Sequence, residues 1–332
     1  MSIRNSDQEV IEVANDWLQS GHAIYLVTVV RTWGSSPRPV GSIAAVRTDG
    51  ELVGSVSGGC VEKQLVESLL REEAKNQSTV ASSESAGFQM ISTLHVDDEQ
   101  ARRVGLSCGG ELELVFEPLT SANALSELNE ATQKRRTLRR SINLNTGHAE
   151  LQSLDDCTLD LSTRFEYNGS VVTKVFGPDW RILIIGAGQL SRYTAEFALA
   201  LDYDVLVCDP RPGFKQAWQV ADIPVLDMSP DDAVLAHATD SNAAVLALTH
   251  DPNLDDLALL EALPSNAFYV GALGSKRNYE KRVRRLAGLG LDDEAINRLI
   301  GPIGLDIGSR TSAEIAISIV AHLVQVRNAK NL

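Results

Sequence analysis

The stretch RILIIGAGQLSRYTAEFALAL, residues 181–201, decides the fold of this 332-residue chain. It opens with a continuous apolar run, which is typical of a buried parallel strand. It then passes through a Gly-x-Gly turn into a segment whose apolar residues recur at helical spacing. A strand, a glycine turn and a helix in this order predict the start of a βαβ unit.

Strands and helices continue to alternate along the chain after this stretch. We expect further strands at 203–209, 243–251 and 267–275, with helices at 254–263 and 276–286. This alternation predicts a doubly wound parallel sheet. The box Thr311-Ser312-Ala313-Glu314 predicts the start of a last helix.

The residues before Gly177-Pro178-Asp179 have a different pattern. An amphipathic helix is expected at 6–20, strands at 23–32 and 111–119, and a hairpin at 42–57 that turns at Asp49-Gly50. The sequence therefore predicts an α/β protein with two domains. Residues 1–177 form an amino-terminal α+β domain, and residues 178–332 form a Rossmann-like domain with a doubly wound parallel sheet.

Composition and charge exclude several classes of protein. Hydrophobic residues make up 44% of the chain and charged residues 22%, so the chain can build a core and is not globally disordered. The net charge of −14 disfavours binding to nucleic acid or to an anionic membrane. No apolar run approaches the ~18 residues of a membrane span, and the polar start predicts no signal peptide. Four cysteines are expected to be free thiols in a reducing cytoplasm.

The glycine turn of the second domain is a candidate phosphate site. Gly186 permits the tight turn, and Gly188 lets backbone N–H groups approach a phosphate at the positive end of the helix. Gln189 opens the helix, and Ser191 stands where the pattern usually has its third glycine. The alternative interpretation is that the two glycines only make a tight turn.

Other candidate ligand residues stand where predicted strands end. Asp209 closes the second strand, at the position of a ribose-binding carboxylate, and Arg211 could instead meet a phosphate. The next two strands end at His250-Asp251 and at Gly274-Ser275, which could line the same crevice. A capping or structural role is the alternative for His250. The basic run at 276–285 is either a solvated helix face or a contact for phosphate or a partner.

Two cysteines of the first domain lie beside paired glycines. These motifs consist of Gly58, Gly59 and Cys60, and of Cys108, Gly109 and Gly110. Paired glycines can form anion-binding concavities, and a thiolate there is a nucleophile, a sulfur acceptor or a ligand for a soft metal. The alternative is that the cysteines are small buried hydrophobes, which is our interpretation of Cys208. The sequence contains no Cys-x-x-Cys, His-Glu-x-x-His, Gly-x-Ser-x-Gly or Walker motif, so zinc, hydrolase and NTPase functions have no support.

Several of these stretches together resemble the XdhC/CoxI family. In the first domain they are VTVVRTWGSSPRPVGSIAAV (27–46), GSVSGGCVE (54–62) and GLSCGGELELVFEPL (105–119). In the second they are RILIIGAGQL (181–190), VCDPRPGF (207–214), LTHDP (248–252), YVGALGSKRNYEKR (269–282) and IGLDIGSRTSAEIAISI (303–319). They follow one another in the family's order.

The resemblance implies a carrier rather than a catalyst, so no catalytic residue is assigned. Members of the family are accessory factors, or chaperones, for molybdenum hydroxylases such as xanthine dehydrogenase. They bind the molybdenum cofactor, protect it while a cysteine desulfurase helps to install a sulfido ligand, and deliver it to the apoenzyme. The family's cysteine motifs map onto Cys60 and Cys108, and Cys108 is our first choice for the molybdenum contact. Gln189 stands where the family usually has a histidine.

The resulting hypothesis places one guest molecule against both motifs. The phosphate of molybdopterin, or the pyrophosphate of its dinucleotide form, would lie on Gly186–Ser191, with the metal toward Cys108 or Cys60. A homodimer is expected, because an exposed cofactor benefits from burial. The rival function is an NAD(P)-dependent oxidoreductase, which Asp209 favours. A third is a structural partner protein whose nucleotide fold is vestigial.

Overall fold

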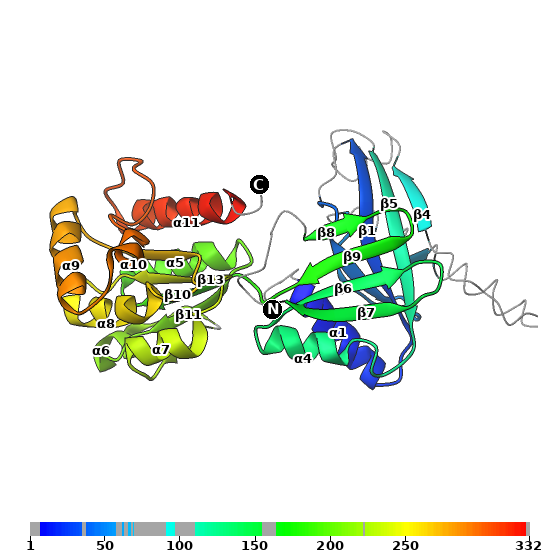
Figure 1. Ribbon diagram of the computed structural model, residues 1–332, viewed down its shortest axis with the longest axis horizontal. Coiled ribbons are helices and arrows are strands. Elements are labelled where there is room, and N and C mark those ends of the chain that lie inside the picture. Colours follow the sequence, from blue (N-terminus) through cyan, green and yellow to red (C-terminus); the bar gives the residue numbers. More distant parts are fainter. Residues whose placement is uncertain are drawn as a thin grey trace, which may run out of the picture. The chain divides into compact units, whose positions relative to one another are not determined.

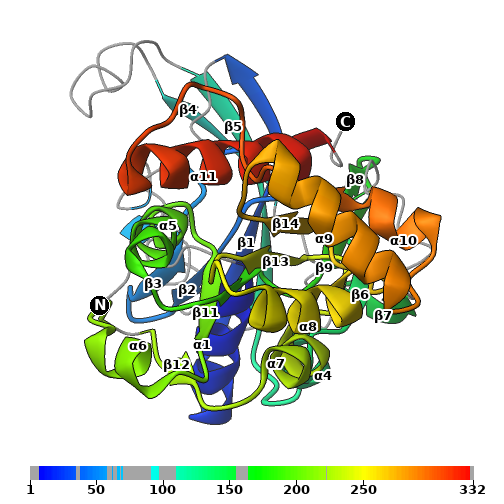
Figure 2. The same ribbon diagram turned by 90° about the vertical axis from the view of Figure 1, so that its left-hand side faces the viewer.

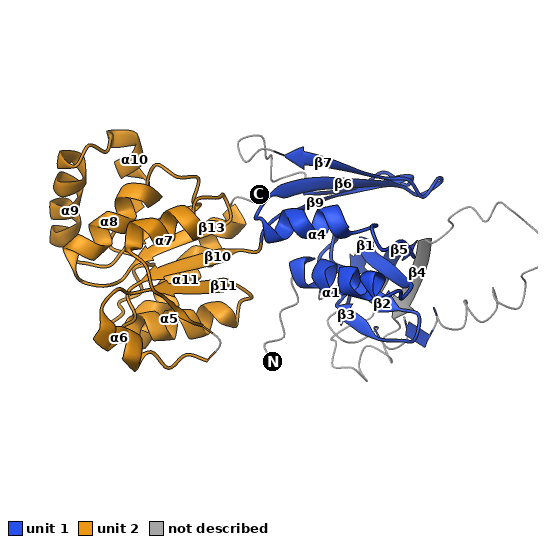
Figure 3. Ribbon diagram, turned by 90° about the horizontal axis from the view of Figure 1, so that it is seen from below, with its two compact units in different colours: residues 1–178 blue, residues 179–332 orange. Residues whose placement is uncertain are grey.

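The computed structural model describes residues 7–34, 38–57, 62, 66–67, 69, 91–96, 110–154, 164–221 and 223–329. The chain divides into two compact units, Met1–Pro178 and Asp179–Leu332, which we call unit 1 and unit 2 and describe separately (Figure 3). None of the described helices is long and apolar enough to cross a membrane.

Unit 2 is built on a parallel sheet of six strands. In chain order these are β10 (Arg181–Ile185), β11 (Asp204–Cys208), β12 (Val225–Leu226), β13 (Ala243–Ala247), β14 (Tyr269–Ala272) and β15 (Leu299–Ile300). Their order in the sheet is β12-β11-β10-β13-β14-β15, and every neighbouring pair is parallel. This is the strand order 3-2-1-4-5-6 of dinucleotide-binding folds. The predicted Rossmann-like fold is confirmed, and the order reverses between β10 and β13.

Helices cover both faces of this sheet (Figure 1). The helices of unit 2 are α5 (Gln189–Leu199), α6 (Pro212–Ala217), α7 (Pro230–His237), α8 (Pro252–Ala262), α9 (Lys276–Gly288), α10 (Asp293–Asn297) and α11 (Ser312–Ala329). On one face Ile182 and Ile184 of β10 pack in one core with α5 and α11. On the other face Leu183 and Ile185 pack with α7, α8 and α9. Figure 2 shows α5 and α11 side by side. Successive residues of β10 therefore serve opposite cores, which explains its uninterrupted apolar run.

Unit 1 contains two antiparallel sheets. The larger has the order β3-β2-β1-β5-β4, with β1 at Ile24–Gly34, β2 at Ile43–Arg47, β3 at Leu52–Gly54, β4 at Ile91–Val96 and β5 at Gly110–Leu119. The smaller has the order β7-β6-β9-β8, with β6 at Thr137–Asn143, β7 at Ala149–Leu154, β8 at Phe165–Tyr167 and β9 at Val171–Phe176. The predicted hairpin is present, because β2 pairs with β3 around Asp49-Gly50. Helices α1 (Asp7–Gln19) and α4 (Ser126–Gln133) share one core with residues of both sheets.

A buried ion pair joins the two sheets of unit 1. Arg140 of β6 donates from Nη1 to Oε2 of Glu117 in β5 at 2.8 Å, and from Nη2 to Oε1. Both side chains are 7% exposed. Removing two charges from water is costly, and the paired hydrogen bonds of the guanidinium offset this cost only while both partners are present. The pair therefore holds the sheets in one arrangement.

We expect Arg140→Leu to lower the free energy of unfolding by about 3–5 kcal/mol, because it leaves the Glu117 carboxylate buried without its partner. Urea denaturation of the full chain measures the change. The double variant Glu117→Gln/Arg140→Leu should recover part of the loss. Lys134→Ala, which breaks the exposed pair between Lys134 and Glu130, serves as the control and should change stability by less than about 0.5 kcal/mol. Equal losses in the Arg140 and Lys134 variants would contradict this account.

Candidate functional site

Two loops meet at the point where the strand order of unit 2 reverses. Gly186, which follows β10, has a φ of +107°. A Cβ at this position would lie 3.0 Å from Cγ2 and 3.1 Å from Cα of Thr249, which follows β13. Only glycine satisfies both the backbone angle and this close approach. Ligands of doubly wound sheets bind at such a reversal, beyond the carboxyl ends of the strands.

The N-terminus of α5 leaves hydrogen-bonding groups open at this place. Gly188 precedes the helix, and no described side chain caps it. A Cβ on Gly188 would meet no described atom within 4 Å, so the described part of the chain leaves the approach to the helix end open. Ser191, in the first turn, is fully buried, and its Oγ has no hydrogen-bond partner among the described residues. Free N–H groups, an open glycine and an unpaired hydroxyl fit a phosphate group.

The start of α11 lies beside the start of α5. Ser312 Oγ lies 3.4 Å from Oε1 of Gln189. The predicted capping box is confirmed, because the Thr311 N–H donates to Glu314 Oε2 at 3.0 Å and the Glu314 N–H donates to Thr311 Oγ1 at 3.3 Å. This box fixes the segment before α11 next to the candidate phosphate site.

The Asp209 carboxylate is part of the glycine turn. Its Oδ2 accepts from the Ala187 N–H at 2.8 Å and from Arg211 Nη2 at 2.8 Å. Its Oδ1 accepts from the N–H and from Nε of Arg211, at 3.0 and 2.8 Å. Burial raises the pKa of Asp209, but the hydrogen bonds from Arg211 and Ala187 outweigh it and leave this pKa lowered. The residue predicted as a ribose ligand thus links the turn to Arg211.

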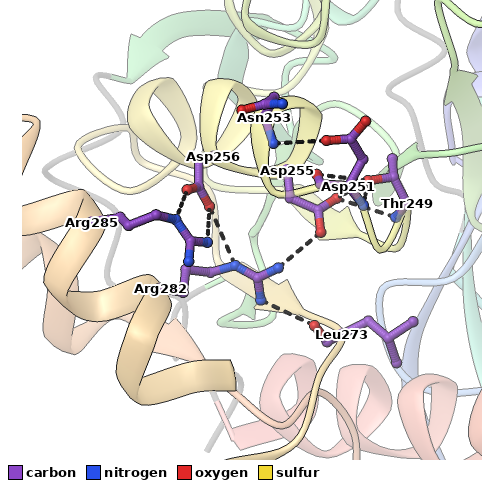
Figure 4. A network of polar contacts seen from close by, with 8 residues as sticks. All are labelled: Thr249, Asp251, Asn253, Asp255, Asp256, Leu273, Arg282 and Arg285. Carbon is purple, nitrogen blue, oxygen red and sulfur yellow. Dashed lines mark hydrogen bonds and ion pairs between the residues drawn. The ribbon is translucent and has the colours of Figure 1, made fainter. Parts of the chain in front are cut away.

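A network of polar contacts joins the loops that follow β13 and β14 (Figure 4). Asp255 of α8 accepts from the N–H and the Oγ1 of Thr249, at 3.2 and 2.7 Å. Arg282 of α9 donates from Nη2 to Asp255 at 2.9 Å, and from Nη1 to the carbonyl of Leu273 at 3.1 Å. Both Asp255 and Arg282 are buried. One arginine therefore holds both loops at the edge of the sheet.

The basic run at 276–285 is only partly a solvated face. Arg282 is buried against Asp255, and Arg285 donates to both carboxylate oxygens of Asp256, at 2.6 and 3.1 Å. Two of its six cations thus tie α9 to α8. Lys276 and Arg277, at the start of α9, are exposed.

The four other candidate residues, which follow β13 and β14, have unusual backbone angles or cap helices in the structure. His250 has a φ of +63° and Gly274 a φ of +151°. Asp251 caps α8, because its Oδ1 accepts from the Asn253 N–H at 3.0 Å. Ser275 caps α9, because its Oγ accepts from the Asn278 N–H at 3.3 Å. These contacts leave the predicted ligand roles open.

The cysteine motifs of unit 1 fall almost entirely outside the described residues. This holds for Gly58, Gly59, Cys60, Cys108 and Gly109, while Gly110 is the first residue of β5. The flanks of the first motif are described, and one carboxylate holds them together.

We call this contact the Glu62 clamp. Glu62 Oε1 accepts from Ser55 Oγ at 2.6 Å and from the N–H groups of Val56 and Ser57 at 3.2 and 3.0 Å, and its Oε2 accepts from Ser57 Oγ at 2.6 Å. Burial would raise the pKa of Glu62, but these hydrogen bonds outweigh it and lower the pKa to about 2. The clamp fixes the chain on both sides of residues 58–61. Sequence reasoning missed it, although two serines followed by an acid were visible.

Cys208 is the one cysteine that the structure describes, and it is buried. Burial, and next the charge of Asp209, raise the pKa of its thiol to about 12. Its Sγ contacts the carbonyl oxygen of Met228 at 3.4 Å. The interpretation of Cys208 as a buried hydrophobe is confirmed. Within the described part of the chain, no group of three or more His, Cys, Asp or Glu residues could hold a metal ion.

Comparison with known proteins agrees with this architecture. Residues 182–323 match the family described as the XdhC Rossmann domain, and residues 17–82 match the XdhC and CoxI family. The chain belongs to the XdhC and CoxI family.

Similar proteins span nearly the whole chain of this family member. It is 28% identical to the molybdenum cofactor insertion chaperone PaoD of Escherichia coli, over 98% of this chain and 90% of PaoD. It is 25% identical to a probable xanthine dehydrogenase subunit of Bacillus subtilis, over 93% and 95% of the two chains. A crystal structure described as a xanthine dehydrogenase from Bacillus halodurans has a TM-score of 0.68 at 25% identity and covers 98% of this chain and 96% of its own.

We expect Gly186→Ala to destabilise the protein by about 1–3 kcal/mol, because alanine is strained at this φ and its Cβ presses on Thr249. Gly188→Ala is the matched control, since it has an ordinary φ of −88° and open space for a Cβ. Thermal unfolding of both variants checks the difference. A Gly188→Ala variant as unstable as Gly186→Ala would show that the close approach to Thr249 is not the cause.

The Glu62 clamp predicts an acid-sensitive contribution to stability. The folded pKa of about 2 lies below the ordinary value of 4.5, so the stabilisation is present above about pH 4.5 and is lost as the pH falls toward 2. In urea denaturation between pH 6 and pH 2, the parent should lose more stability than Glu62→Gln. Glu12→Gln, at an exposed glutamate of α1, should follow the parent. Parallel curves for the parent and Glu62→Gln would refute the clamp.

Proposed function

We propose that this protein is a maturation factor that binds the molybdenum cofactor and delivers it to a molybdenum hydroxylase of the xanthine dehydrogenase type. The names of two relatives support this proposal: one is a molybdenum cofactor insertion chaperone, and the other is a probable xanthine dehydrogenase subunit. Both align with more than nine tenths of this chain.

The observation that carries the proposal is the open N-terminus of α5. The unpaired Ser191 hydroxyl and the free approach over Gly188 fit a phosphate group. Molybdopterin carries a phosphate, and its dinucleotide form carries a pyrophosphate, so either form of the cargo has a group for this place. Gly186 fixes the turn against Thr249 before any ligand arrives.

The thiols of unit 1 supply the second contact in this proposal. The molybdenum of the cofactor is bound by sulfur, and a thiolate is a soft contact for it. Cys108 is the first choice and Cys60 the second. The Glu62 clamp supports a role for the Cys60 segment, because it holds both ends of a short stretch of chain in place. The buried Cys208 thiol, whose pKa is about 12, is not a candidate.

The finer steps belong to the same proposal. The carrier protects the cofactor while a cysteine desulfurase helps to add the sulfido ligand, and it then meets the apoenzyme in the cytoplasm. A homodimer would bury the cargo further. The protein acts as a carrier, and no residue is proposed as catalytic.

An NAD(P)-dependent oxidoreductase is the second candidate function. The strand order of unit 2 favours it. The position of Asp209 counts against the NAD form, because both carboxylate oxygens already accept hydrogen bonds within the protein. The oxidoreductase requires turnover of a reduced nicotinamide, which the carrier does not.

Metal content tests the proposal directly. Protein produced in a molybdate-supplemented host is expected to contain molybdenum and pterin, measured by elemental analysis and by fluorescence after pterin oxidation. Cys108→Ala should lower molybdenum per chain about tenfold or more, since a bound metal loses a sulfur contact. Gly188→Ala should lower pterin content, because its Cβ enters the approach to α5.

Cys208→Ala is the matched control, and it should leave molybdenum content unchanged if its thermal unfolding resembles that of the parent. Unchanged molybdenum in Cys108→Ala, in Cys60→Ala and in the double variant would end the thiol assignment. Parent protein that contains neither molybdenum nor pterin would end the proposed function.

A further inference from the structure

The end of β11 differs from the usual site for a ribose. In dinucleotide-binding folds, a carboxylate at the end of the second strand accepts hydrogen bonds from ribose hydroxyls. Asp209 occupies this position, yet its side chain is 0% exposed. Its two oxygens accept four hydrogen bonds, from Ala187 and Arg211. A ribose could reach this carboxylate only if Arg211 moved away.

Arg211 is the charged group that this end of the sheet presents instead. Its Nε and Nη2 are used on Asp209, and its Nη1 has no hydrogen-bond partner among the described residues. The side chain is 30% exposed. The guanidinium lies over the ring of Phe214, with Cζ 3.9 Å from the ring centroid. The Asp209 carboxylate and the Phe214 ring together hold the guanidinium in one orientation. Its Nη1 edge is left open for a ligand.

The Asp209 carboxylate connects the Arg211 guanidinium to the candidate phosphate site. Asp209 accepts from Ala187, which lies between Gly186 and Gly188 of the turn, and from Arg211 through the same oxygen, Oδ2. The carboxylate thus connects the turn before α5 to the guanidinium. A ligand seated at the N-terminus of α5 would extend along the end of β11 toward Arg211.

We propose that Arg211 is the ligand contact at the end of β11, that Asp209 is the positioning residue that holds it, and that unit 2 therefore selects a ligand with a phosphate at this place over one with a free ribose diol. This inference rests on the proposed function only in using the same end of α5. It names the part of the site that discriminates between nucleotide-like ligands.

The charges around Arg211 limit the size of the effect. Asp209 faces it most closely, and the charges of Asp251 and Asp255 also raise its pKa. Asp255 is paired with Arg282, and Asp251 caps α8. Of these three carboxylates, only that of Asp251 has no basic partner among the described residues. We expect a preference for the phosphorylated ligand of about tenfold, which is near the lower limit for a hydrogen bond to a charged group.

A matched pair of probes tests this selection. NADH and NADPH differ only by a phosphate on the ribose, and both can be titrated by fluorescence against the full chain. The parent should bind NADPH about tenfold more tightly than NADH. Arg211→Gln should reverse the order. It removes the phosphate contact and frees oxygens of Asp209 for the diol, so NADPH binding weakens while NADH binding strengthens.

Two further variants separate selection from a loss of structure. Arg211→Lys keeps the charge without the fork and should keep part of the preference for NADPH. Arg284→Gln, at a residue 76% exposed on α9, should behave as the parent. Thermal unfolding of each variant shows whether it is folded.

Three results would overturn the inference: tighter or equal binding of NADH by the parent, no binding of either probe, or an equal loss of both probes in Arg211→Gln. Molybdenum content is measured separately on the same preparations. Protein that holds molybdenum but lacks the NADPH preference contradicts only this inference. Protein that shows the preference and its reversal but never contains molybdenum contradicts only the proposed function.

Discussion

The close approach of Gly186 to Thr249 is the constraint on which unit 2 depends. It brings the turn after β10 against the loop after β13, at the place where the strand order reverses. The turn then presents the start of α5, and Asp209 fixes it from the other side through Ala187. Thr249 passes the contact on to Asp255 and Arg282. One position without a side chain thus sets the arrangement of the candidate phosphate site.

The sequence predicted the parts of unit 2 that depend on local pattern. The apolar run before Gly186 identified β10, and the strands β13 and β14 were found in the same way. The two-residue strands β12 and β15 and the helices α6, α7 and α10 were missed, because elements this short have no readable period. The predicted strand at 243–251 was too long. β13 ends at Ala247, where Thr249 and Asp251 begin to bond their own loop and helix.

The sequence predicted where several side chains lie along the chain, but not which side chains they contact in the fold. Asp209 was expected at the end of the second strand and lies there, but its contact with Arg211 depends on the turn through Pro210, in which the Arg211 N–H and side chain both donate to Asp209. The basic run on α9 did not indicate that Arg282 pairs with two aspartates of a different helix, α8. In unit 1, the pairing of Arg140 with Glu117 joins different sheets, and no local pattern marks it. Cys60 and Cys108 remain predictions, because they lie outside the described residues.

Arg282 couples the positions of the two loops at the edge of the sheet. Because a single side chain grips the carbonyl after β14 and the acid that organises the loop after β13, neither loop can shift without pulling on the other. Two loops that share an anchor are harder to replace one at a time than two independent loops. Grafting either loop alone from a relative would break the contacts of Arg282. The two loops and this arginine should therefore be transferred together.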